Sequence, residues 1–139
     1  MDALPIRLSP GDDLRRALQA AIASSGCGAG FVVSGIGSLS EARLRFAGAD
    51  EARLLEADLE ILTLAGSVSA DASHLHATLA TPDGHVVGGH VGYGCIVRTT
   101  AEVLIALLDA WDFGREHDAA TGYNELAIRR KAAAPGTPT

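Results

Sequence analysis

The chain has 139 residues, of which 47% are hydrophobic and 20% charged, with a formal net charge of −6. This length suits one domain built around a single core, and the apolar content excludes an intrinsically disordered chain. The acidic balance argues against the broad basic surface with which DNA-binding proteins neutralise phosphates. No apolar run approaches the length of a membrane-spanning helix, so no membrane partner is expected.

Composition also bears on assembly and compartment. With so few charged residues, a chain of this size carries more apolar surface than a monomer can bury, so we expect a homo-oligomer. Cys27 and Cys95 are too few for a disulfide framework, and residues 1–13 lack the basic start and long apolar stretch of an export signal. We therefore expect reduced, buried cysteines and a cytoplasmic location.

The first predicted element is a helix that begins after Ser9 and ends before Gly26. Ser9 has the side chain of an N-cap, and Pro10 suits the first helical position, where no N–H is needed. Asp12 and Asp13 would face the positive end of the helix, and Gly26 can supply the left-handed residue that ends it. Its buried face would consist of Leu14, Leu18, Ala21 and Ile22.

Two kinds of element are predicted after this helix. Residues 30–37 and 55–68 contain apolar runs typical of buried strands, and residues 41–48 alternate like a strand with one exposed face. Residues 94–111 carry the chain into a second helix, because Thr99 and Glu102 have the spacing of a capping box. Its packing face would consist of Val103, Leu104, Leu107, Leu108 and Trp111.

The end of the chain predicts a last strand over residues 124–131 and a disordered tail over residues 132–139. Helices that fall between groups of strands with hairpin signals indicate an α+β fold with an antiparallel or mixed sheet. We expect a single domain over residues 1–131.

The densest motif is a histidine-rich hairpin over residues 73–90. In a strand over residues 73–80, His74 and His76 share one face, at Cα atoms roughly 6.5–7 Å apart. Residues 81–84, Thr-Pro-Asp-Gly, predict a type I turn closed by a left-handed glycine, with a one-residue bulge. Such a turn sets the register in which the two strands pair, and this register places His90 opposite His76.

The register has one open alternative. Gly88 and Gly89 could add a bulge and shift the parity, which would disperse the histidines. In the preferred register His85 falls on the other parity and is left out of the site. His74, His76 and His90 then converge, and three imidazoles with an open fourth position are typical of zinc. Neutral imidazole also suits iron, nickel and copper, so the sequence favours a divalent metal, most of all zinc.

Three segments, residues 59–68, 74–105 and 113–126, resemble the plants and prokaryotes conserved (PPC) domain, a family that follows an AT-hook in plants and stands alone in prokaryotes. The likeness runs from Leu4 to Arg129. Its most specific parts are the His-Leu-His element at 74–76, Gly88-Gly89-His90, the Thr-Ala-Glu element at 100–102, and Arg115 with Asp118 and Gly122.

This resemblance carries several implications. It implies a mostly antiparallel, strongly bent sheet with a few helices, a homotrimer, and metal ligation by the matching histidines of the prokaryotic branch. The family's provisional DNA-binding label depends in plants on an Arg-Gly-Arg-Pro core, which this sequence lacks. A weaker resemblance, to cupins, is kept as an alternative. It lacks the glutamate expected after the His-x-His pair in residues 77–84, and a helix near residues 10–25 is out of place in that fold.

Three functions remain open. The first is a trimeric metal-binding module with a regulatory or small-ligand-binding role. The second is a hydrolase or lyase that uses the same metal to activate water and needs a general base. Its acidic candidates are Glu56, Asp58, Glu60 and Glu102. The third is a direct DNA-binding regulator. Tyr93, close to His90 in the chain, and Arg115, part of the family likeness, have no assigned role.

Overall fold

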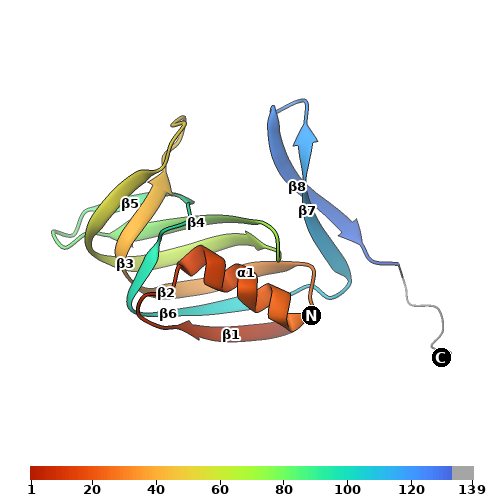
Figure 1. Cartoon of the computed structure of the whole chain (residues 1–139), viewed down its shortest axis with the longest axis horizontal. Helices are drawn as coiled ribbons and strands as arrows, with labels where there is room; N and C mark the ends of the chain where they lie inside the picture. The colour runs from red at the N-terminus through yellow and green to blue at the C-terminus, as the bar shows by residue number, and fades with distance from the viewer. Residues whose placement is uncertain (133–139) are drawn as a thin grey trace.

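The computed structural model of the chain describes residues 1–132, which contain eight strands and one helix (Figure 1). In chain order the elements are β1 Asp2–Leu8, α1 Leu14–Ser25, β2 Gly30–Arg45, β3 Arg53–Val68, β4 Ser73–Ala80, β5 Val86–Val91, β6 Ile96–Leu107, β7 Trp111–Asp118 and β8 Tyr123–Arg130. The tail expected over residues 132–139 lies, from residue 133 onward, outside the described residues.

Six strands form one antiparallel sheet in the order β1-β6-β2-β3-β4-β5. Strand β5 also pairs with the far end of β2, through Leu44 with Val91 and Arg45 with His90. Because β5 bonds to both β4 and β2, the sheet bends round until one end closes on itself. The expected single domain with a bent antiparallel sheet is confirmed. The expected "few helices" is wrong, since residues 1–132 contain one short helix.

Helix α1 begins later than the sequence indicated. It starts at Leu14, and Asp13 is the N-cap, because its carboxylate accepts a bond from the Arg16 N–H at 3.1 Å. The proposed cap at Ser9 is wrong. The N–H of Ser9 donates instead to the Asp12 carboxylate at 2.8 Å, which closes a separate turn before the helix.

The other end of α1 agrees with the prediction, and so does its buried face except at Ala21, which is only partly buried. Gly26 caps the helix in the left-handed region at φ 71°. Leu18 and Ile22 are fully buried, and a Cβ on Gly30 would lie 2.8 Å from Ile22 Cδ1, so α1 packs closely on the sheet. With 12 residues, α1 is shorter than a bilayer requires, and no helix in the described part has the length and apolar character of a membrane span.

The predicted second helix is wrong, because residues 96–107 form β6, a central strand that pairs with both β1 and β2. Val97, Val103 and Ile105 are buried and β-branched, and they recur with the two-residue period of a strand. Thr99 is no helix cap, since its hydroxyl shares a 2.6 Å hydrogen bond with that of Ser38 on β2. The neighbouring strands β1 and β2 form hydrogen bonds with the backbone of β6 on both sides. This pairing outweighs the local signals for a helix.

Strands β7 and β8 form a separate hairpin that projects from the main sheet (Figure 1). The predicted last strand is confirmed as β8, whereas β7 and β1 had no counterpart in the prediction. The Phe113 ring meets Phe31 edge to face at 5.4 Å between centroids. Arg115 donates from Nη2 to Ser67 Oγ at 3.3 Å. The β7–β8 hairpin therefore packs beside β2 and β3, the strands that carry Phe31 and Ser67.

Candidate metal centre

The β4–β5 hairpin has the predicted turn and register. The N–H of Thr81 donates to the His85 carbonyl at 2.8 Å, and the N–H of Gly84 donates to the Thr81 carbonyl at 2.9 Å. Gly84 lies in the left-handed region at φ 83°, as the turn requires. His76 pairs with His90, so the register that brings the histidines together is confirmed.

The glycines before His90 do not shift the parity. Gly88 pairs with Thr78 and Gly89 with Ala77 in an unbroken ladder. A Cβ on Gly89 would lie 2.8 Å from the carbonyl oxygen of Arg45. Glycine at this position therefore allows β5 to approach β2 closely, and the alternative register is not realised.

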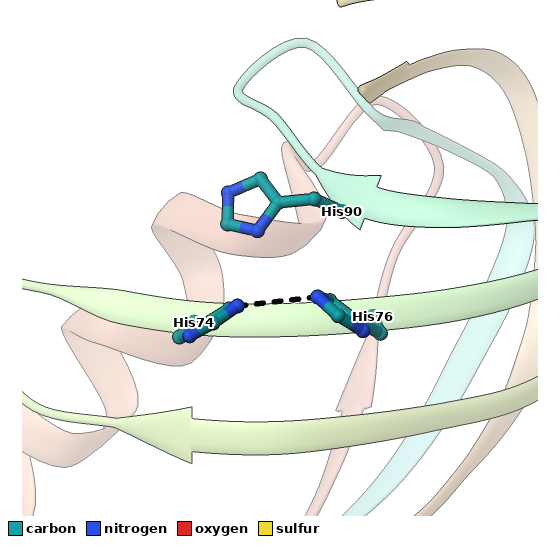
Figure 2. Close-up of side chains that lie close together, drawn as sticks. All are labelled: His74, His76 and His90. Carbon is teal, nitrogen blue, oxygen red and sulfur yellow. Dashed lines mark hydrogen bonds between the residues drawn. The ribbon is translucent and has the colours of Figure 1, made fainter. Parts of the chain in front are cut away.

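His74, His76 and His90 converge on the side of the hairpin that faces away from the core (Figure 2). Leu75 and Leu79 of β4 are fully buried, which leaves the alternate residues on the other face. One ring nitrogen from each histidine lies within 4.8 Å of the other two. The Nε2 atoms of His74 and His76 are 3.1 Å apart. Figure 2 shows the His90 ring above this pair, with one nitrogen directed toward it.

This arrangement fits a metal ion. Three nitrogens bound tetrahedrally at 2.0–2.1 Å lie about 3.3 Å from one another, close to the His74–His76 separation. In addition, His90 Nδ1 is buried and has no hydrogen-bond partner among the described residues. Buried polar atoms are rarely left without a partner, so this nitrogen has an unused lone pair or proton at the centre of the cluster. The donor set suits a divalent metal with one position open.

The surroundings of His74 and His90 keep these two imidazoles neutral. Burial, followed by the charges of His74 and Arg15, lowers the pKa of His90 to about 4. The pKa of His74 is also lowered, first by burial and then by His76 and Arg115. Both rings are therefore unprotonated near pH 7, which is the form that binds a metal.

Arg15 of α1 holds the two histidine-bearing strands together. It donates from Nη1 to the Val91 carbonyl at 3.1 Å and from Nη2 to the Ser73 carbonyl at 2.8 Å. Ser73 and Val91 are the chain neighbours of His74 and His90. The Arg15 guanidinium also lies 4.5 Å from the centre of the Tyr93 ring. Tyr93 packs on the helix in this way. It lines neither of the two cavities beside the histidines, which are described next.

Two cavities flank the cluster. One, of about 470 Å³, is lined by His74 and His90, and the other, of about 320 Å³, by His74 and His76. Arg115 and Glu125 of the β7–β8 hairpin line both cavities. The resemblance to the PPC family singles out Arg115. Nothing in the local sequence pattern indicates that Glu125, Arg15 or Arg45 lines the larger cavity.

The acidic residues expected as general bases lie elsewhere. None of Glu56, Asp58, Glu60 and Glu102 lines a cavity beside the histidines. Asp58 forms an ion pair with Arg98 at 2.8 Å, and Glu102 lies on β6 beside a different cavity. The left-out histidine, His85, sits at the turn, where its Nδ1 contacts the Asp83 carboxylate at 2.6 Å.

Two curated relatives match nearly the whole chain. The bifunctional protein GlmU of Synechococcus sp. (strain JA-2-3B'a(2-13)) is 44% identical over 135 residues, which cover 97% of this chain and 21% of the relative. The bifunctional protein GlmU of Synechococcus sp. (strain JA-3-3Ab) is 45% identical over 135 residues, which cover 96% of this chain and 22% of the relative. The chain thus spans about a fifth of the length of the relatives it matches.

Solved structures share the fold. A hypothetical protein from Salmonella has a TM-score of 0.90 at 34% identity, covering 94% of this chain and 95% of the other. A metal-containing protein from Archaeoglobus fulgidus has a TM-score of 0.76 at 29% identity, covering 91% and 94%. A protein from Bacteroides thetaiotaomicron with a provisional DNA-binding label has a TM-score of 0.79 at 22% identity, covering 90% and 91%, which shows the fold alone.

The family model gives the most direct assignment. The model of the Plants and Prokaryotes Conserved (PCC) domain, the family called PPC above, matches residues 1–109. This range includes the whole β4–β5 hairpin and all three histidines of the cluster. The chain belongs to the Plants and Prokaryotes Conserved domain family.

Proposed function

We propose that this chain is a trimeric, zinc-binding PPC module that acts by regulation or by binding a small ligand. The observation that carries the proposal is the convergence of His74, His76 and His90, with ligand nitrogens within 4.8 Å of one another and a buried, unpartnered Nδ1 on His90. A three-protein-ligand site leaves one coordination position for a further group. The similar metal-containing protein from Archaeoglobus fulgidus supports the metal-binding part of this proposal.

Zinc is the metal that the donors favour. All three donors are imidazole nitrogens, and His74 and His90 are neutral near pH 7. Zinc accepts such nitrogens in tetrahedral geometry without a demand for carboxylate oxygens. A bound zinc ion would supply Lewis acidity and a fixed positive charge at this surface.

Exposed apolar side chains support the trimer. Large hydrophobic residues face solvent on both β2 and β3, the longest strands of the sheet: Phe31, Val33, Ile36, Leu54 and Leu62. An exposed apolar surface of this kind is typical of a protein interface. The edge of β1 is a further unpaired strand edge in the order of the sheet.

Relatives in longer proteins support an accessory role. In the two cyanobacterial relatives, a segment similar to this chain makes up about a fifth of a protein named for two activities. A module of that size, attached to other activities, suits regulation or ligand sensing. We also propose a cytoplasmic location, to which the free and buried Cys27 and Cys95 are suited.

A metal-dependent hydrolase or lyase is the second candidate. One observation favours it: Glu125 lines both cavities beside the cluster and could serve as a proton acceptor there. An activity screen with and without chelator separates the two candidates. Direct DNA binding has less support, because the labelled relative of 22% identity shows the fold alone and the chain has a net charge of −6.

Metal analysis of protein purified without a histidine tag tests the proposal. We expect about one zinc ion per chain by plasma mass spectrometry, and a higher melting temperature with zinc than after chelation. His76→Ala and His90→Ala should each weaken zinc binding at least tenfold, because each removes one of three ligands.

His85→Ala and His117→Ala are the matched controls. His85 lies at the turn and His117 on β7, so both variants should keep the zinc content of the unchanged protein. A zinc content near zero that does not rise when zinc is added, with an unchanged melting temperature, would overturn the proposal.

A further inference from the structure

The larger cavity beside the cluster has a feature that metal ligation does not require. Besides His74 and His90 it is lined by three arginines from three separate elements, Arg15 of α1, Arg45 of β2 and Arg115 of β7. Its volume of about 470 Å³ lies in the range of small-molecule sites. The fold thus gathers three guanidinium groups next to the histidines.

These arginines have no acidic partner in the part of the chain that the structure describes. Among the described residues, none of the three forms an ion pair with a carboxylate. Their recorded bonds go to neutral oxygens: Arg15 to the carbonyls named above, Arg45 to the Ala49 carbonyl at 3.3 Å, and Arg115 to the Ser67 hydroxyl. Each guanidinium has five N–H donors, so each keeps donors to spare. Arg15 Nε is buried and has no hydrogen-bond partner within residues 1–132.

The charge balance favours an anion. Asp50 and Glu125 are the carboxylates that line the cavity, against the three guanidinium groups. A divalent metal on the histidines would add two positive charges. The cavity is therefore positive on a chain whose net charge is −6, and such a concave site concentrates small anions.

We infer that this cavity binds a small organic oxyanion, whose carboxylate or phosphate group lies between the guanidinium groups of Arg15, Arg45 and Arg115 and the metal. The inference rests on the proposed function, since the metal forms one side of the site. The planar fork of arginine donors matches both oxyanions with two parallel bonds, which an ammonium or a neutral ligand would not use.

Calorimetric titration of zinc-loaded, desalted protein with inorganic phosphate and, separately, with succinate tests the inference. At least one of these two anions should bind with a dissociation constant below roughly 1 mM, because it would form charge-assisted hydrogen bonds with several arginines. Arg45→Gln and Arg115→Gln should each weaken this binding at least fivefold and leave the zinc content unchanged. Arg53→Gln, at an exposed arginine of β3 outside the cavity, should leave both unchanged.

The outcomes separate this inference from the proposed function. Binding of phosphate or of succinate that both arginine variants weaken supports the oxyanion site. The anion that binds more tightly identifies whether the site prefers a phosphate or a carboxylate group. Zinc uptake without anion binding, or anion binding unaffected by both arginine variants, would overturn the inference and leave the metal function standing. Arginine-dependent anion binding by a protein that takes up no zinc would overturn the metal function and the metal side of the site, and would leave the arginines as the anion-binding groups. Because Arg45 and Arg115 lie on different elements, misfolding of one variant leaves the other as the test.

Discussion

His90 and His85 lie five residues apart in one hairpin, yet their surroundings differ completely. His85 is exposed at the turn and contacts the Asp83 carboxylate. His90 is half-buried on β5, next to two other imidazoles and two arginines, and its pKa falls to about 4. The alternation of a strand predicted this division, because neighbouring positions of opposite parity point to opposite faces. The arginines that lower the His90 pKa come from elements far away in the chain.

Cys95 gives a prediction at the same scale. Its side chain is fully buried, and burial raises the pKa of the thiol to about 11. Only the thiolate reacts with alkylating reagents, and pH 8 lies well below that pKa, so Cys95 should stay protonated and inaccessible. We expect no iodoacetamide adduct on Cys95 in native protein at pH 8 by peptide mass spectrometry. The same treatment in urea should label it, and rapid labelling of native protein would contradict the buried position.

At the scale of the element, local and non-local signals gave different results. The β4–β5 hairpin was predicted down to its register, because its turn residues and its alternation all lie within one short segment. Strand β6 was predicted as a helix, because its two partners, β1 and β2, are distant in the sequence. Strand formation depends strongly on such neighbours, whereas capping and helical spacing can be recognised locally.

The turn of this hairpin can be tested directly. Gly84→Ala places a Cβ at φ 83°, where no atom lies within 4 Å but the left-handed conformation is unfavourable. The free energy of unfolding in urea should fall by about 1–2 kcal/mol. Gly114→Ala is the control, since Gly114 has no positive φ and a Cβ at this position would lie 3.9 Å from its nearest neighbour, Arg129 Nη1. It should change stability by less than about 0.5 kcal/mol, and equal losses in both variants would contradict the role of the turn.

At the scale of the whole molecule, the curved sheet has two different faces. One covers α1 and encloses the core, in which Leu14, Leu18 and Ile22 of the helix are fully buried. Elsewhere on β2 and β3, large apolar side chains remain exposed, Val33 at 61% and Ile36 at 53%. Burial of this surface against other copies of the chain would account for a hydrophobic content of 47% with so few charged residues.

The proposed trimer leads to a prediction about this surface. If the proposed trimer forms through this surface, Val33→Glu should give monomers, as measured by light scattering after size-exclusion chromatography, because the interface would then bury an unpaired carboxylate. The exposure of Val33 means that the monomer itself should still fold. Val86→Glu, at 58% exposure on β5, is the matched control and should remain trimeric. Dissociation by both variants, or by neither, would contradict an interface on β2 and β3.

The sequence by itself determined the family, the histidine hairpin and the buried stripe of α1, because each depends on turn chemistry, strand alternation or helical spacing within a short stretch. Only the tertiary structure decided that residues 96–107 are a central strand and that Asp13, rather than Ser9, caps the helix. It also decided which charges surround the cluster. Arg15, Arg45 and Glu125 reach the histidines because the sheet closes on itself and the β7–β8 hairpin docks beside it, and packing between such distant segments leaves no periodic signal in the sequence.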